Sequence, residues 1–78
     1  MLDTTRHILE RHPEKKEQIL RLILRDAEFR AMCEDYGKCV EAIEYWDQSQ
    51  TPGAKDKADE YRYISKEIEE EILQALKA

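Results

Sequence analysis

Glycine, proline and cysteine are scarce in this sequence. Its 78 residues include two of each, with one phenylalanine and one tryptophan. So few turn formers, beside 40% charged and 41% hydrophobic residues, favour long amphipathic helices. The sequence also has no Gly-rich phosphate loop, no GxGxxG motif and no Ser–His–acid set. It is too apolar and too periodic for a disordered acidic tail.

Long apolar runs are missing as well. The most apolar stretch, residues 19–24 (ILRLIL), is interrupted by Arg21 and falls far short of the ~20 apolar residues that a membrane span needs. The first residues, MLDTTRHILERHPEKK, have no apolar core long enough for a secretory signal. We therefore expect a soluble, cytoplasmic protein that does not bind a membrane.

A concentrated basic face, typical of DNA-binding and anionic-membrane proteins, is also absent. The net charge is −5, and residues 26–50 hold two basic and seven acidic side chains. Residues 1–25 lean mildly basic, through Arg6, Arg11, Lys15, Lys16, Arg21 and Arg25. Because acidic residues alternate with them, a salt-bridged solvent face is the favoured interpretation. A nucleic-acid-associated accessory protein that uses this basic segment is the alternative.

Capping signals divide the chain into helices. Asp3 is a candidate N-cap for a short helix over residues 4–12, and Pro13 suits the first turn of a second helix that runs to about residue 24. Asp26 is a candidate cap for a third helix. No glycine or proline forces a break there, so the sequence leaves open whether residues 13–50 form one helix or two.

Two heptad-like seams predict a helical hairpin. The first consists of Phe29, Cys33, Tyr36, Val40 and Ile43. Residues 47–55 (DQSQTPGAK) then read as a turn. The second seam consists of Ala58, Tyr61, Ile64, Ile68, Ile72, Ala75 and Leu76. Five pairs of positions have nearly constant sums, from Phe29 with Leu76 to Ile43 with Tyr61, as facing residues of an antiparallel hairpin do.

A second apolar stripe exceeds what the hairpin buries. It consists of Met32, Cys39 and Trp46, each seven residues apart. The segment with Ile19, Leu22 and Ile23 is likewise apolar on more than one face. Either the N-terminal helices fold back onto this stripe, or a second copy covers it. A dimer with a helical-bundle core is the favoured prediction.

Neither cysteine forms a recognisable chemical site. Cys33 and Cys39 lie about 9 Å apart along one helix and about 240° apart around it. A disulfide requires Cα atoms within ~7 Å, so the two thiols cannot bridge without unfolding the helix. Metal-binding CxxC spacing is missing, and both residues fall on apolar stripes. We predict that they pack as small hydrophobic residues.

Histidines and clustered carboxylates give no catalytic or metal site either. His7 and His12 are five apart, the wrong spacing for two ligands on one helical face, and they read as surface or helix-end residues. The carboxylates at 67, 69, 70 and 71 read as a solvated face, because Ile68 and Ile72 point to the core. We therefore expect no catalytic residue, no cofactor and no bound metal.

Aromatic residues gather near the hairpin tip. Tyr45 and Tyr63 point outward, at opposing levels, and Trp46 is close by. Tyrosine and tryptophan favour interfaces, so they could form a partner-binding patch, although scattered surface aromatics are the favoured interpretation. Gly37 lies in mid-helix, where it permits either a close helix approach or a bend.

Residues 12–78 resemble the YdcH-like family of short bacterial proteins, a domain family of unknown function. The resemblance rests on HPEKKEQI, on DAEFRAMCEDY with Phe29 and Tyr36, on the turn, and on EYRYISKEIEEEIL. It implies a helical hairpin, often with a leading helix, in a bacterial cytoplasm. It implies no catalytic residue and no ligand. The two cysteines and Trp46 depart from the family pattern.

The sequence thus predicts a single all-α domain over residues 1–78. A short N-terminal helical segment (1–24) precedes a long antiparallel hairpin (25–78), with arms at about 26–50 and 55–77. The predicted function is a non-enzymatic protein–protein interaction or assembly module, with a homodimer favoured and an unknown protein partner as the alternative occupant. The candidate interaction residues are Ile19, Leu22, Ile23, Met32, Cys39, Tyr45, Trp46 and Tyr63.

Overall fold

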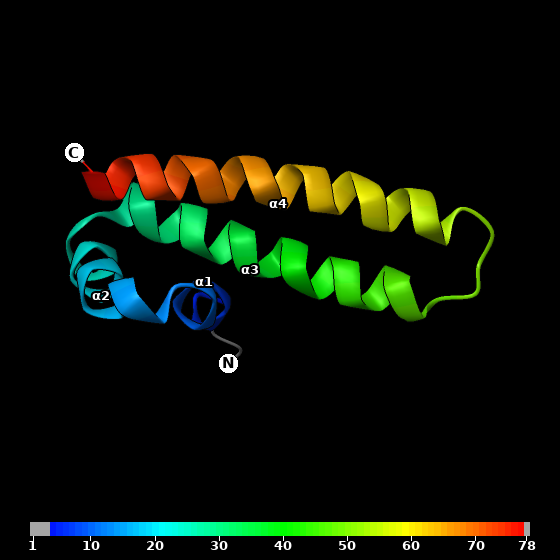
Figure 1. The fold of residues 1–78 in the computed structure, drawn as a ribbon, viewed down its shortest axis with the longest axis horizontal. Helices are drawn as coiled ribbons and strands as arrows, with labels where there is room; N and C mark the ends of the chain where they lie inside the picture. Colours follow the sequence, from blue (N-terminus) through cyan, green and yellow to red (C-terminus); the bar gives the residue numbers. More distant parts are fainter. Residues whose placement is uncertain (1–3, 78) are drawn as a thin grey trace.

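The computed structural model of the chain describes residues 4–77, of which 88% are helical and none is in a strand (Figure 1). In chain order the elements are α1 (Arg6–Arg11), the short 3-10 helix η1 (Pro13–Lys15), α2 (Lys16–Arg25), α3 (Ala27–Gln48) and α4 (Ala54–Lys77). The predicted all-α class is confirmed. The expected capping of the first helix by Asp3 lies outside the described residues.

Helices α3 and α4 form the predicted long antiparallel hairpin, which accounts for most of the length of the molecule (Figure 1). Its arms agree with the expected 26–50 and 55–77 to within two residues. Asp26 separates α2 from α3, with backbone angles φ −131° and ψ 106°. Residues 13–50 are therefore not one continuous helix, and Asp26 is the predicted cap: its carboxylate accepts hydrogen bonds from the backbone N–H groups of Glu28 and Phe29.

The turn between the two long helices uses the residues that the sequence marks for it. Gly53 has φ +87°, a left-handed conformation that only glycine adopts without strain. The backbone N–H of Ala54 donates to the carbonyl of Thr51 at 3.0 Å, which closes the turn. The Thr51 hydroxyl accepts a hydrogen bond from the Ser49 hydroxyl. The contact of Thr51 with the start of α4 is made by its backbone carbonyl, which accepts from Ala54.

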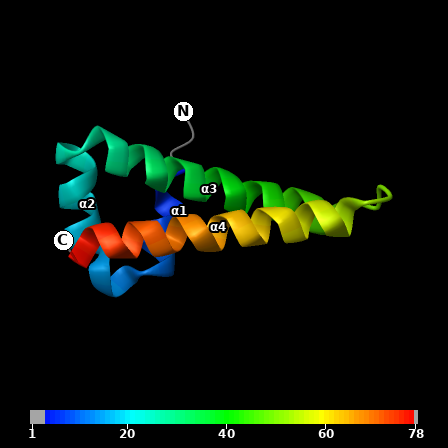
Figure 2. The same cartoon turned by 90° about the horizontal axis from the view of Figure 1, so that it is seen from above.

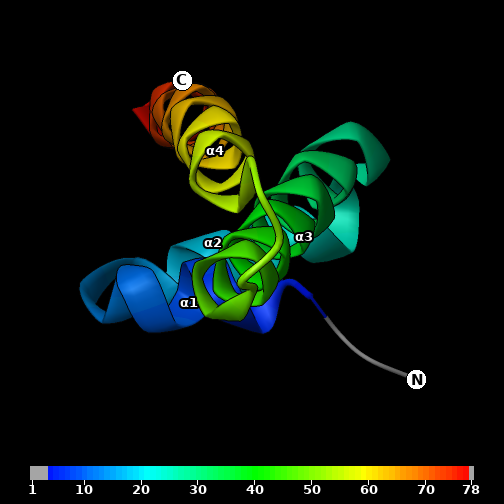
Figure 3. The ribbon, with the colours of Figure 1, turned by 90° about the vertical axis from the view of Figure 1, so that its right-hand side faces the viewer.

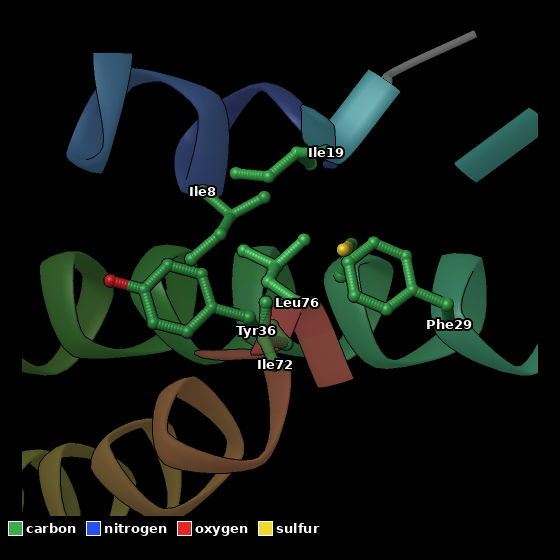
Figure 4. Packing of buried hydrophobic residues seen from close by; sticks show 7 residues of the cluster. Ile8, Ile19, Phe29, Tyr36, Ile72 and Leu76 are labelled. Carbon is green, nitrogen blue, oxygen red and sulfur yellow. The ribbon is translucent and has the colours of Figure 1, made fainter. Parts of the chain in front are cut away.

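Helices α1 and α2 lie at the end of the hairpin opposite the turn, which we call the base (Figures 1 and 2). Figure 2 shows α2 crossing the base between the start of α3 and the end of α4. The main hydrophobic core sits here, where side chains of α1 and α2 meet those of α3 and α4 (Figure 4). Its fully buried members are Ile8, Ile19, Phe29, Cys33 and Ile72.

Gly37 permits a close approach of the N-terminal segment to α3. A Cβ atom at this position would lie 2.0 Å from the carbonyl oxygen of Thr4 and 2.6 Å from its Cβ. The Thr4 hydroxyl donates to the carbonyl oxygen of Glu34 at 3.0 Å, on the same side of α3. Of the two roles open to this glycine, the structure thus favours close approach.

Beyond the base, α3 and α4 continue as a two-helix arm, residues 42–65 (Figures 1 and 2), which Figure 3 shows from the turn end. On α4, Ala54 and Ala58 are buried, but Ile64 is 42% exposed. The prediction that Ile64 is a seam residue is therefore wrong. Ser65 is partly buried and continues the spacing of three and four residues from Tyr61 to Ile68. The helical spacing, and not the hydrophobicity of the side chain, therefore makes Ser65 rather than Ile64 the seam residue.

Candidate interaction surface

Four large side chains lie at one level of the arm. Asp47 of α3 forms an ion pair with Arg62 of α4, which shows that residues 47 and 62 lie at about the same level of the two helices. In an antiparallel pair this register puts Tyr45 and Trp46 beside the level of residues 63 and 64. We call Tyr45, Trp46, Tyr63 and Ile64 the tip collar.

Most of the tip collar is open to solvent. Tyr45 and Tyr63 are each 66% exposed, which confirms that both point outward, and Trp46 is partly buried. The Tyr45 and Trp46 rings meet edge to face, with centroids 5.0 Å apart and planes at 83°. Such a pair presents large, rigid apolar surface and loses little side-chain entropy on binding.

Tyr63 also has a polar neighbour. The Glu67 carboxylate, one helical turn further along α4, raises the pKa of Tyr63 through hydrogen bonding and its negative charge. The ring therefore remains a neutral phenol at physiological pH. Together with Lys57, Glu60, Tyr61 and Ile64 it lines a shallow hollow on the outer side of α4.

Met32 and Cys39 do not form an open stripe. Gly37, where the N-terminal segment packs, is two residues from Cys39 and so about 160° away around α3. The N-terminal segment therefore packs on the side of α3 away from Cys39, so of the two alternatives for the stripe it is not the one that covers Cys39. Cys39 is nevertheless only 7% exposed without a second copy, and Met32 lies beside Glu67 and Glu71 of α4, so α4 is the helix that covers this side.

The apolar face of α2 is directed inward. Ile19 is fully buried in the base core, and Leu22 and Ile23 pack against that core while partly buried. Ile19 and Cys39 are therefore not accessible to a partner in this structure. Leu20 and Leu24 are the exposed apolar residues of α2, at 38% and 85%.

A polar cluster that the sequence did not predict ties α1 to both long helices. The Glu69 carboxylate of α4 accepts hydrogen bonds from Arg11 Nε at 3.1 Å and from His12 Nε2 at 2.7 Å. His7 Nε2 lies 3.0 Å from a carboxylate oxygen of Glu41 on α3. The prediction that Glu69 is solvated is wrong, since its side chain is 16% exposed. Of the histidines, predicted as surface or helix-end residues, His12 does lie at a helix end, as the C-cap of α1, but neither is a surface residue: the side chains of His12 and His7 are 17% and 9% exposed.

The electrostatics of Glu69 follow from these contacts. Burial acts to raise the pKa of its carboxyl, but the hydrogen bonds from His12 and Arg11 outweigh burial and lower the pKa below its ordinary value. The neighbouring Tyr36 hydroxyl has a raised pKa, because it is buried and because Glu69 is negatively charged. Glu69 is thus a fixed negative charge that holds two basic side chains of the N-terminal segment.

Both thiols behave as packing groups, as predicted. Cys33 is fully buried, and this burial, with the charge of Glu34, raises its pKa to about 12. Burial also raises the pKa of Cys39. Because the thiolate is the reactive form, both side chains are poor nucleophiles. Within residues 4–77 no three His, Cys, Asp or Glu side chains gather as a metal site.

Half of the basic N-terminal side chains have acidic partners within the chain. Arg6 pairs with Glu10 at 3.7 Å, Arg21 with Glu17 at 3.7 Å, and Arg11 with Glu69 at 3.1 Å. These pairs support the salt-bridged interpretation over a phosphate-binding strip. In the part of the chain that the structure describes, no helix has the length and apolar character that a membrane crossing requires.

Comparison of the chain with protein families, with curated proteins and with solved structures finds no match. The resemblance to the YdcH-like family therefore stays a prediction from the sequence.

Proposed function

We propose that this protein is a non-enzymatic assembly module of the cytoplasm that binds a second copy of itself through the tip collar. The observation that carries the proposal is the exposure of Tyr45 and Tyr63, 66% each, on an arm that projects beyond the base core. Tyrosine and tryptophan are the residues most often found at the energetic centre of protein interfaces.

The surface around the collar is compatible with self-association. The start of α4 carries equal numbers of opposite charges, Lys55, Lys57 and Arg62 against Asp56, Asp59 and Glu60, while the end of α3 adds Glu44 and Asp47. The arm therefore has only a small net negative charge, and its mixed charges allow complementary pairing between two copies. An interface of standard size buries about 800 Å² per partner, roughly one seventh of the 5805 Å² that this chain exposes. A two-helix arm can supply that area along its length.

Sedimentation equilibrium over a wide concentration range tests the proposal. We expect the wild-type chain to self-associate, and the double variant Tyr45→Ala, Tyr63→Ala to lower the association constant by about thirtyfold or more, since a lost aromatic anchor costs ~2 kcal/mol. Leu24→Ala is the control, because Leu24 is a large apolar side chain, 85% exposed, at the opposite end of the molecule.

Two results would overturn the proposal. One is a wild-type chain that remains monomeric at the highest concentration. The other is a collar variant that associates as tightly as the Leu24→Ala control. Circular dichroism of each variant shows whether the helices persist, which is expected because the replaced side chains are exposed.

A further inference from the structure

The break between α2 and α3 is confined to one residue. Asp26 N–H still donates to the Leu22 carbonyl at 2.9 Å, and the Asp26 carbonyl accepts from the N–H of Arg30 at 3.0 Å. Both are the i to i−4 bonds of an α-helix. Only the N–H groups of residues 27–29 leave the helical pattern, and the Asp26 carboxylate accepts two of these, from Glu28 at 3.0 Å and Phe29 at 3.1 Å.

Nothing in the sequence around Asp26 enforces this break. Residues 22–30 (LILRDAEFR) contain neither proline nor glycine, and each of them is compatible with a continuous helix. A straight helix would return all three N–H groups to helical carbonyl partners. The bent form is therefore held by the Asp26 cap and by the contacts that residues 4–25 make with the base.

The contacts between residues 4–25 and the long helices form an interface within one chain that has both an apolar and a polar part. Its apolar part is Ile8 and Ile19 in the base core, which is shown in Figure 4. Its polar part joins residues 4–25 to both long helices through Thr4 with Glu34, His7 with Glu41, Arg11 and His12 with Glu69, and Gln18 with the Leu76 carbonyl. The same segment of another copy presents the same groups, so it fits this surface by identity.

We propose that residues 4–25 exchange between two copies of the chain, with Asp26 as the hinge. In the exchanged dimer α2 and α3 join into one helix of residues 16–48, and each base core receives Ile8 and Ile19 from the partner copy. Domain exchange of this kind needs no new complementary surface, only a linker that has two stable conformations. This inference does not depend on the tip collar, because the exchanged interface lies at the base.

Substitutions at the hinge shift the two forms in opposite directions. Asp26→Ala removes the carboxylate that accepts the N–H groups of Glu28 and Phe29 in the bent form. The straight helix does not need this carboxylate, so it is left intact. A lost N-cap costs about a factor of five, and a dimer contains two hinges, so the dimerisation constant should rise about twenty-five-fold. Asp26→Ser retains a capping oxygen and is the matched control.

Ala27→Pro should have the reverse effect. Residue 27 is the first position of α3, where proline is well tolerated, and Asp26 already has the extended conformation that a residue before proline prefers. In the straight helix the same proline would sit in the interior and clash with the carbonyl of Ile23. This variant should therefore stay in the bent, unexchanged form.

The experiment places each hinge variant in the Tyr45→Ala, Tyr63→Ala background, so that association through the tip collar is suppressed. Sedimentation equilibrium should show a dimer for Asp26→Ala, a much weaker one for Asp26→Ser, and a monomer when Ala27→Pro is added to Asp26→Ala. In a mixture of isotope-labelled and unlabelled Asp26→Ala chains, nuclear Overhauser effects should connect Ile8 of one copy with Tyr36 of the other.

An Asp26→Ala chain that stays monomeric while its circular dichroism shows folded helices would overturn the exchange. So would a dimer that persists after Ala27→Pro is added, or one in which Ile8 contacts Tyr36 only within the same copy. If the Asp26→Ala chain is unfolded as a monomer, it is refolded at high concentration, once with Ala27 intact and once with Ala27→Pro added. The exchange requires that only the chain with Ala27 recovers its helicity, and that it does so as a dimer. If the chain with wild-type Asp26 and Ala27 shows no association that depends on Tyr45 and Tyr63, that result counts against the proposed function and not against this exchange.

Discussion

Replacing Glu69 by glutamine removes the charge on which two side chains of the N-terminal segment converge, while the size of the side chain is kept. The Glu69 carboxylate accepts from His12 at 2.7 Å and from Arg11 at 3.1 Å. A hydrogen bond to a charged group contributes about 1.5–3 kcal/mol when it is buried. Because the Arg11 side chain is 62% exposed, solvent screens its share.

The glutamine oxygen can still accept one hydrogen bond, so we expect Glu69→Gln to lower the free energy of unfolding by about 1–2 kcal/mol. For a domain of this size the midpoint of thermal unfolding should fall by about 5–10 °C. Thermal and urea unfolding at neutral pH, followed by far-UV circular dichroism, measures both quantities. The control is Glu71→Gln, since Glu71 is exposed and should change stability by less than about 0.5 kcal/mol.

The loss should also depend on pH, with a definite sign. The pKa of Glu69 is lower in the folded chain than the ordinary value of about 4.3 that it has when unfolded. Its contribution is therefore fully present above that ordinary value and is lost as the pH falls through the lowered folded value. The stability difference between wild type and Glu69→Gln should shrink as the pH falls below that ordinary value. Equal losses for Glu69→Gln and Glu71→Gln, or a difference that grows in acid, would refute the reasoning.

Three further substitutions or reactions test the packing. Gly37→Ala should destabilise the fold by about 1 kcal/mol, because the clash with the Thr4 carbonyl exceeds the gain in helix propensity; a more stable variant would contradict the close approach. Ile19→Ala should cost about 2–5 kcal/mol in urea unfolding and Leu24→Ala less than about 0.5, and similar costs would contradict the orientation of α2. With a pKa of about 12, the Cys33 thiol should be about one part in ten thousand thiolate at pH 8, so alkylation should be slow until denaturant is added; rapid labelling of the native chain would contradict its burial.

The hairpin could be predicted because its signals are local. The spacing of Phe29, Cys33 and Tyr36 repeats along one helix, and Gly53 marks the turn without reference to any distant residue. The outward direction of Tyr45 and Tyr63 follows from the same helical geometry, and their exposure confirms it. These features need no knowledge of how the N-terminal segment packs.

Features that depend on the N-terminal segment could not be predicted in this way. Glu69 has acidic neighbours on both sides and reads as part of a solvated face until α1 is placed beside it. The inward directions of His7 and His12 depend on the same placement. Gly37 gave a signal, as a helix breaker in mid-helix, but the sequence offered no means of naming the segment that approaches it.

The position of residues 4–25 is set by polar and small residues more than by the apolar pattern. Ile8 and Ile19 could be buried against several apolar faces, because hydrophobic contact has no preferred direction. The contact of Gly37 with Thr4 and the convergence of two basic side chains on Glu69 each have one geometry, and together they select one face of the hairpin. These same contacts are independent of which copy supplies the segment, so the residues that fix its place within one chain also make it exchangeable between two.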